Sequence, residues 1–202
     1  MALISGGKDS IFSTIQCIAK GHNLICLANL YPITCKETDS FMYQTVGSEM
    51  VEVIGEAIGV SLFRREIKGL SINTELAYTC SDKDEVEDLY ELLKEIVEKY
   101  KTQGIEIQAV SAGAVFSSYQ KARVENVCGR LKLECLAPLW QIEEHLLLES
   151  AILKWHVDAI IVKVCTLGLE KKHLGGHLKD LFEYLKQIVI YINKKYRIRN
   201  MV

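Results

Sequence analysis

The sequence predicts an α/β protein built on a mainly parallel, doubly wound sheet. Short apolar runs alternate with helical patterns from end to end, which is typical of consecutive βαβ units. A glycine-rich turn joins the first apolar run to the first helical pattern. Gly21, Gly59 and Gly104 each follow a helical pattern, where a left-handed cap is favoured. Together these features indicate parallel strands connected by helices, with ligands bound beyond the carboxyl ends of the strands.

Each element is expected from its own pattern of apolar residues. Strands are expected at residues 2–4, 24–30, 62–67, 105–115, 134–138 and 159–164, where apolar and β-branched residues run together. Helices are expected near residues 10–20, 41–58, 84–102, 119–131, 142–155 and 177–196, where apolar residues recur at helical spacing. The Gly6-Gly7 loop and residues 29–32, 111–119 and 163–168 lie at the carboxyl ends of expected strands, so we expect them to line one crevice.

Composition narrows the class of protein. The 202 residues allow one large domain or two small ones, and the net charge of −2 argues against broad nucleic-acid binding by a basic surface. No apolar run reaches membrane-spanning length, and no signal peptide is recognised at the N-terminus. The seven cysteines form no C-x-x-C pair, and they are expected to be reduced thiols of a cytoplasmic protein: Cys17, Cys26, Cys35, Cys80, Cys128, Cys135 and Cys165.

The hexapeptide Ser5-Gly6-Gly7-Lys8-Asp9-Ser10 is the most informative segment. A glycine turn between a strand and a helix N-terminus offers free N–H groups and the positive end of the helix dipole to an anion. Lys8 adds a cation and Ser10 a hydroxyl donor, while Asp9 suits a metal ion that accompanies a phosphate. The alternative is an ordinary tight turn capped by Asp9 or Ser10.

Three further clusters are weaker when each is taken alone. Residues 84–90 are acidic and start a helix, so Glu85, Glu87 and Asp88 could simply favour the helix dipole and face water. The segment 42–47 places Tyr43, Gln44 and Thr45 together early in an expected helix. The segment 113–125 passes from small residues into a polar helix start; its Arg123 could hold a phosphate or carboxylate, and its serines could be N-caps.

The hexapeptide resembles the signature of the PP-loop ATP pyrophosphatases. All of the clusters in order resemble the diphthine–ammonia ligase family: the hexapeptide, residues 39–47, residues 84–89, Gly113-Ala114-x-x-Ser117-x-Tyr119-Gln120-x-x-Arg123-Val124-Glu125, Pro138-Leu139-Trp140 and His173-Leu174-Gly175. The resemblance covers residues 1 to about 196. It implies an adenine-nucleotide α-hydrolase-like (HUP, Rossmann-like) fold, with an ATP-binding domain over residues 1–130 and a smaller α/β region over residues 131–202.

The resemblance also implies a reaction and its participants. ATP would adenylate the carboxylate of diphthine on the translation elongation factor, and ammonia would then form the amide, with AMP and pyrophosphate released. No cysteine shows a nucleophile pattern, so ammonia should come from solution or from another protein. The rival interpretations are a tRNA-modifying PP-loop enzyme, which would want a basic face or catalytic cysteines, and an inactive nucleotide-binding module.

The same resemblance assigns residue roles, which stand here as expectations. Catalytic roles fall to Lys8, Asp9, Glu85, Glu87, Asp88, Tyr119, Gln120, Arg123 and Glu125. Nucleotide binding falls to Ser5, Gly6, Gly7, Lys8, Asp9, Ser10 and Asn29, with magnesium at Asp9; substrate binding falls to Tyr43, Gln44, Thr45 and Ser117. A Gly-Glu-Gly-Gly-Glu-(Tyr/Phe)-Glu-Thr motif of the family is not found after residue 196, so the second region is expected to be incomplete and the activity of this chain reduced.

Overall fold

The fold was determined as a computed structural model, which describes residues 1–32, 40, 42–44, 46–165 and 168–196. The chain forms two compact units, Met1–Trp140 and Gln141–Val202. The first unit therefore extends past the boundary expected near residue 130, because the strand at residues 134–136 pairs with the sheet of the first unit. No helix in the described part of the chain is both long and apolar enough to cross a bilayer.

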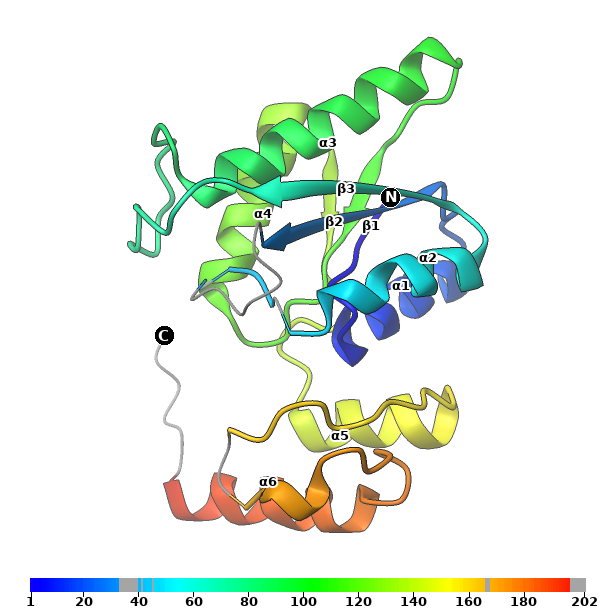
Figure 1. Cartoon of the computed structure of the whole chain (residues 1–202), viewed down its shortest axis with the longest axis vertical. Coiled ribbons are helices and arrows are strands. Elements are labelled where there is room, and N and C mark those ends of the chain that lie inside the picture. Colours follow the sequence, from blue (N-terminus) through cyan, green and yellow to red (C-terminus); the bar gives the residue numbers. More distant parts are fainter. Residues whose placement is uncertain (33–39, 41, 45, 166–167, 197–202) are drawn as a thin grey trace. The chain divides into compact units, whose positions relative to one another are not determined.

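The first unit is built on a five-stranded parallel sheet (Figure 1), as the alternating pattern predicts. Its strands are β1 (Ala2–Leu3), β2 (Cys26–Pro32), β3 (Ser61–Ile67), β4 (Ala109–Ser111) and β5 (Glu134–Leu136), in the order β3-β2-β1-β4-β5. The register places Ala2 between Leu27 of β2 and Ser111 of β4. The carboxyl ends of the strands consequently lie at one edge, and the turn after β1 lies at the middle of that edge.

Helices cover both faces of this sheet (Figure 1). They are α1 (Lys8–Ala19), α2 (Val51–Ile58, preceded by the 3-10 turn Ser48–Met50), α3 (Glu85–Thr102) and α4 (Ser118–Leu131). Successive residues of β2 supply the two cores, since side chains alternate along a strand. Leu27 packs with Val51 and Ile4 in the cluster of α1 and α2, whereas Cys26 and Ala28 pack with the buried residues of α3 and α4.

Several expected elements of the first unit are shorter in the structure, two of them by several residues. The run 105–115 contributes only three residues to β4, because Ile105 still belongs to the turn that ends α3 and donates its N–H to Tyr100. The helix expected from residue 41 begins only at Ser48, and Gly47 before it has a φ of +76°. Tyr43 and Gln44 therefore lie in a loop and not in the first turn of a helix.

The second unit differs more from expectation. It contains α5 (Glu144–Glu149), the π-helical turn Ser150–Lys154, the 3-10 turn Lys171–His173 and α6 (Phe182–Tyr196). The strand expected at 159–164 is wrong: the segment forms a single antiparallel bridge between Ile160 and His177. Ile161 packs instead with side chains of the surrounding helices, including Ile152 and Phe182, so its apolar character serves a core. The described residues of this unit thus form helices and one bridge.

Candidate functional site

The glycine turn after β1 has the geometry of an anion-binding loop. Gly6 has a φ of +80°, which a residue with a side chain rarely adopts, and α1 begins at Lys8 with Gly7 as its N-cap. The hydroxyl of Ser10 accepts from the Ser5 N–H at 3.2 Å and donates to the Gly7 carbonyl at 2.9 Å. Ser10 therefore holds the loop in shape. Among the described residues, the N–H groups of Lys8, Asp9 and Ser10 meet no acceptor, so they remain available to an anion.

A cavity of about 220 Å³ lies beside this loop. Its walls come from the turn after β1, from residues 28–30 of β2 and from the segment after β4, together with the loop before α2 and the first turns of α4. Its lining includes Ser5, Gly7, Asp9, Ser10, Asn29, Tyr43, Gln44, Gly113 and Gln120. The predicted crevice at the carboxyl edge is confirmed for these three segments. The segment 163–168 was expected there as well, but no strand precedes it, so the reason for that expectation is lost.

Two close contacts fix the loop between neighbouring segments. A Cβ placed on Gly113 would lie 2.8 Å from the backbone nitrogen and Cα of Ser10. A Cβ on Gly7 would lie 2.7 Å from the Oε1 atom of Gln44. The β4–α4 segment and the loop before α2 therefore approach the anion-binding turn as closely as glycine permits.

The charged residues of the loop pair with each other. Lys8 Nζ lies 2.7 Å from Asp9 Oδ1, and both side chains are 37% exposed. In the part of the chain that the structure describes, no three Asp, Glu, His or Cys residues could enclose a metal ion. A single carboxylate still suits magnesium, which usually binds one or two protein carboxylates and takes its other ligands from phosphates and water. Asp9 thus fits a metal ion that arrives with a nucleotide.

Asn29 lines the cavity, and both ends of its side-chain amide form hydrogen bonds. It is 3% exposed; its Nδ2 donates to the Ile4 carbonyl at 2.8 Å, and its Oδ1 accepts from Arg64 Nε at 3.0 Å. Arg64 was not among the residues expected at the site. Its signal in the sequence is a charged pair, Arg64-Arg65, inside an apolar strand pattern, and the register of β2 and β3 sets Arg64 beside Asn29.

The residues assigned to substrate binding fall into two groups. Tyr43 and Gln44 line the cavity; Tyr43 donates its hydroxyl to the Glu85 carbonyl at 3.0 Å, and burial raises its pKa well above the ordinary value. Gln120, which was expected to be catalytic, also lines the cavity and donates to the Met42 carbonyl at 3.0 Å. Ser117 is the N-cap of α4, accepting from the Gln120 N–H. Thr45 lies outside the described residues.

The carboxylates of Glu85 and Asp88, at the start of α3, accept hydrogen bonds from other segments of the chain. Glu85 is 3% exposed and accepts from Ser40 Oγ at 2.7 Å and from Ser71 Oγ at 2.6 Å. Asp88 accepts from the N–H groups of Lys68 and Gly69 at 2.8 and 2.7 Å. Neither carboxylate lines the cavity. Both instead hold the β3–α3 loop, which we define as residues 68–84.

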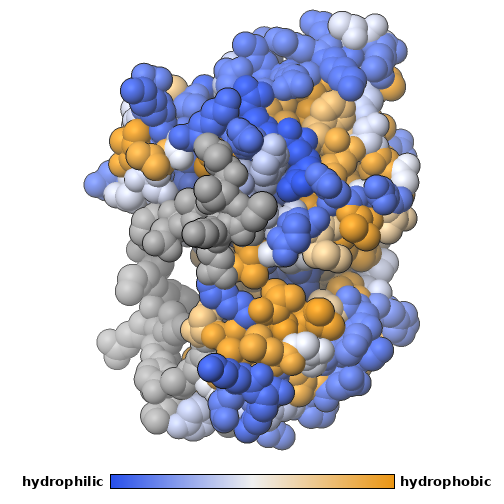
Figure 2. All heavy atoms as spheres, viewed as in Figure 1, coloured by the Kyte–Doolittle hydropathy of each residue, from blue (hydrophilic) through white to orange (hydrophobic). Residues whose placement is uncertain are grey.

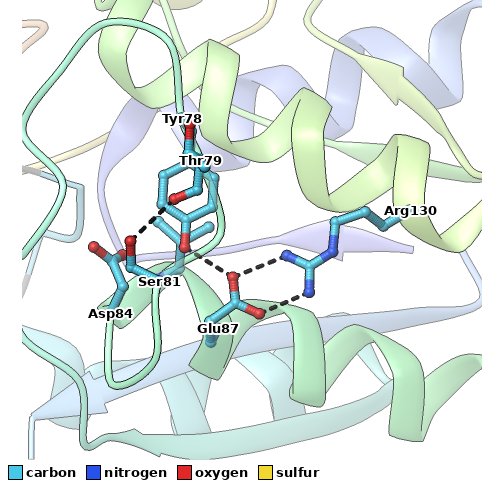
Figure 3. Close-up of polar contacts among 7 residues, drawn as sticks. Tyr78, Thr79, Ser81, Asp84, Glu87 and Arg130 are labelled. Carbon is cyan, nitrogen blue, oxygen red and sulfur yellow. Dashed lines mark hydrogen bonds and ion pairs between the residues drawn. The ribbon is translucent and has the colours of Figure 1, made fainter.

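Glu87 is held by two residues of the same region (Figure 3). Arg130 of α4 donates to both of its carboxylate oxygens, at 2.9 and 2.7 Å, and the Tyr78 hydroxyl donates to one of them at 2.8 Å. The hydrogen bonds from Arg130 hold the pKa of Glu87 below its ordinary value. Burial, followed by the bond to Glu87, raises the pKa of Tyr78. This carboxylate therefore ties α3, α4 and the β3–α3 loop together.

Arg123 and Tyr119 contact the same loop from α4. Arg123 is fully buried and donates to the carbonyls of Asn73 and Glu75 at 2.5 and 2.9 Å. Its guanidinium carbon lies 3.2 Å from the centre of the Tyr119 ring, and the Tyr119 hydroxyl donates to the Asn73 carbonyl. Glu125, by contrast, forms an exposed ion pair with Lys121 one turn earlier. The catalytic roles assigned to these residues stay predictions, and the contacts seen are structural.

The outer side of the β3–α3 loop is apolar. Leu70, Ile72 and Leu76 are 70%, 51% and 61% exposed. Figure 2 shows apolar side chains among polar ones on this loop, which projects at the left of Figure 1. The loop is therefore anchored on its inner side by carboxylates and Arg123, while its outer side chains face solvent.

Comparison with known proteins adds an independent line of information. Residues 1–135 match the family model described as the diphthamide synthase N-terminal domain. The proteins named diphthine–ammonia ligase from Mus musculus and Homo sapiens are each 48% identical to this chain over 200 residues, covering 96% of it and 71% of the relative. The relative of that name from Schizosaccharomyces pombe is 42% identical over 199 residues, covering 98% of this chain and 31% of the relative.

The match extends over the whole first unit and most of the second. It includes the anion-binding turn, the segments that line the cavity and the residues that anchor the β3–α3 loop, because all of these lie within the matched residues. The resemblance inferred from the motifs is thus confirmed, and the chain belongs to the diphthine–ammonia ligase family.

Proposed function

We propose that this chain catalyses the ATP-dependent amidation of diphthine to diphthamide; its relatives are named diphthine–ammonia ligase. The observation that carries the proposal is the anion-binding turn at the carboxyl end of the central strand. The N–H groups of Lys8, Asp9 and Ser10, which meet no acceptor in the described part of the chain, suit the phosphates of a nucleotide. The cavity beside them is lined by both polar and apolar residues.

The proposed reaction has two balanced steps. A carboxylate oxygen of diphthine attacks the α-phosphorus of ATP, the bond to the β-phosphate oxygen breaks, and pyrophosphate leaves with the electron pair. The nitrogen of ammonia then attacks the carbonyl carbon of the acyl-adenylate, AMP leaves, and one proton is lost from nitrogen. The enzyme has to stabilise negative charge on the departing pyrophosphate in the first step, which fixed N–H donors and a cation do well.

In this proposal the residues of the anion-binding turn stabilise the negative charge of the phosphates. The N–H groups of Lys8, Asp9 and Ser10 and the ammonium of Lys8 bind phosphate oxygens. Asp9 would hold magnesium, which supplies further neutralisation of the phosphate charge. Ser5, Gly7 and Asn29 line the cavity and Gly6 shapes the turn beside it, which supports assigning them to the nucleotide. Tyr43, Gln44 and Gln120 line the same cavity and are assigned to the substrate. Glu85, Glu87, Asp88, Tyr119 and Arg123 act by positioning the β3–α3 loop.

The remaining parts of the proposal concern partners and location. The substrate side chain belongs to the translation elongation factor, and the nitrogen comes from free ammonium, since no cysteine of the described segments lines the cavity. The cysteines of the described segments, six in number, are all unpaired, which agrees with the reducing cytoplasm. The net charge of −2 gives no support to a tRNA substrate.

ATP–pyrophosphate exchange in the presence of the diphthine-bearing factor is the test of this function. Exchange that requires both magnesium and the factor is expected, followed by amidation when ammonium is added. Glutamine should not replace ammonium when free ammonia is excluded. ATP binding without exchange would point to an inactive nucleotide-binding module.

A matched pair of variants assigns the effect to the loop. Lys8→Ala should weaken ATP binding roughly 10- to 100-fold, because it removes a charge-assisted contact. Lys20→Ala changes an exposed lysine at the other end of the same helix and should bind ATP like the parent. Equal ATP affinity of the two variants would show that Lys8 does not take part in ATP binding. Asp9→Asn should chiefly raise the magnesium concentration needed for binding.

A further inference from the structure

Arg64 lies next to the nucleotide site without lining the cavity. It projects from β3, opposite Asn29 in the register of β2 and β3, and its side chain is 17% exposed. Each nitrogen of its guanidinium has a different acceptor. Nε donates to Asn29 Oδ1 at 3.0 Å, Nη2 to the Ser48 carbonyl at 3.0 Å, and Nη1 to Glu52 Oε1 at 2.5 Å.

Two of these acceptors adjoin residues that border the anion-binding turn. Asn29 donates to the Ile4 carbonyl, one residue before Ser5. Ser48 follows Gly47, whose carbonyl oxygen lies 3.3 Å from the position of a Cβ on Gly6, and Val51 of the same segment lies 3.4 Å from that position. Arg64 thus connects both flanks of the turn: Asn29 beneath its start and residues 47–51 beside Gly6.

The orientation of the Asn29 amide depends on Arg64. A guanidinium can only donate, so the Asn29 atom that faces it has to be the carbonyl oxygen, and the amide nitrogen then faces Ile4. Arg64 is also held over the Tyr31 ring at 4.5 Å, which limits its rotation. The bond to Glu52 adds little, since that side chain is 66% exposed.

We propose that Arg64 is a positioning residue for the nucleotide: it fixes Asn29 and residues 47–51 against the Gly6-Gly7 turn and so keeps the turn ready to bind phosphate. This inference rests on the proposed function for its ligand. A lysine at position 64 would keep the charge but could not reach the acceptors of Nε and Nη2 with the planar geometry of a guanidinium.

The next residue of the same strand provides a matched control. Arg65 forms one ion pair with Glu95, at 3.2 Å, and its side chain is 35% exposed. Arg64→Lys is expected to raise the Kd for Mg-ATP at least tenfold and the KM for ATP in parallel, whereas the KM for the diphthine-bearing factor stays within twofold. Arg65→Lys and Glu52→Gln are expected to bind ATP within twofold of the parent. Affinities are compared at a temperature at which circular dichroism shows each variant fully folded.

A second measurement needs no nucleotide. Amide hydrogen exchange of residues 5–10 and 47–52 should be at least fivefold faster in Arg64→Lys than in Arg65→Lys. Equal exchange in the two variants, or equal ATP affinity, would overturn the positioning role. A parent chain that binds no ATP, together with faster exchange in Arg64→Lys, would overturn the proposed function and leave the mechanical role of Arg64 supported.

Discussion

The Nη2 atom of Arg123 lies 2.5 Å from the backbone carbonyl oxygen of Asn73, although the two residues are 50 positions apart in the sequence. The same guanidinium donates to the carbonyls of Glu75 and Tyr119 and lies over the Tyr119 ring. The buried cation therefore finds two of its acceptors in the folded loop, and the carbonyls of Asn73 and Glu75 are held to α4 by the same guanidinium.

Replacing Arg123 by methionine should therefore destabilise the protein strongly. Arg123→Met keeps much of the apolar volume but removes the charged donor shared by the carbonyls of Asn73, Glu75 and Tyr119, at an expected cost of about 2–3 kcal/mol in the free energy of unfolding. Urea denaturation measures the change. Arg65→Met, which removes an exposed ion pair, should cost no more than about 0.5 kcal/mol. Similar losses in the two variants would contradict the structural role of Arg123.

Glu87 predicts a pH-dependent contribution to stability. Its pKa is lowered in the folded protein by Arg130, so its stabilising effect is present above the ordinary pKa of a glutamate and is lost as the pH falls through the folded pKa. The parent should therefore be more stable than Glu87→Gln near pH 7, and the two should converge in acid. Thermal melts from pH 7 down to pH 3 test this. Glu98→Gln, which alters an exposed residue of the same helix, should follow the parent throughout.

Gly113→Ala should disturb the anion-binding turn. Its Cβ would meet the backbone of Ser10 at 2.8 Å, and neither backbone can move freely, so ATP affinity should fall at least tenfold with a loss of about 1–3 kcal/mol in stability. Gly129→Ala is the control, since a Cβ there meets no atom within 4 Å and the site lies within α4. That variant should be more stable than the parent by up to about 1 kcal/mol. ATP affinity unchanged in Gly113→Ala would show that the contact is unimportant.

Glu85→Gln should lower both the stability of the protein and its turnover. An amide can accept through one atom only, so either Ser40 or Ser71 loses its acceptor, at about 1–3 kcal/mol. Ser40 also accepts from the N–H groups of Met42 and Tyr43, so the cavity wall should shift and turnover should fall with it. Glu91→Gln, on the exposed side of α3, should change neither quantity. Full turnover in Glu85→Gln would show that this carboxylate holds its serine partners without affecting the cavity.

The sequence predicts local features of this protein well. The helix expected at 84–102 is observed as Glu85–Thr102, because its apolar spacing is unbroken and Asp84 caps it by accepting from the Val86 N–H. The anion-binding turn was equally recognisable, since a strand, two glycines and a helix start lie within ten residues. The prediction of a strand at 159–164 was wrong because a short apolar run suits a core between helices as well as a strand. Only tertiary packing decides which of the two forms.

The mutual positions of the site residues could not be predicted in the same way. The partners of Arg123 and Asp88 are backbone groups of a loop with no periodic pattern, and a backbone carbonyl or N–H has no signature in the sequence. Arg64 was missed for the same reason: its role depends on the register between β2 and β3, and the amino acid itself does not reveal that register.

The short central strand has a consequence for the order in which the protein folds. Ala2 and Leu3 of β1 pair with Leu27 and Ala28 on one side, but on the other side Ala2 needs Ser111 of β4. The pairing of Ala2 with Ser111 closes a long loop of the unfolded chain, which costs conformational entropy. Contacts between residues far apart in the sequence also slow folding. During synthesis, the turn that would receive the nucleotide leaves the ribosome early, yet it cannot reach its native form until β4 has followed. Nucleotide binding should therefore report a late event in the folding of the first unit.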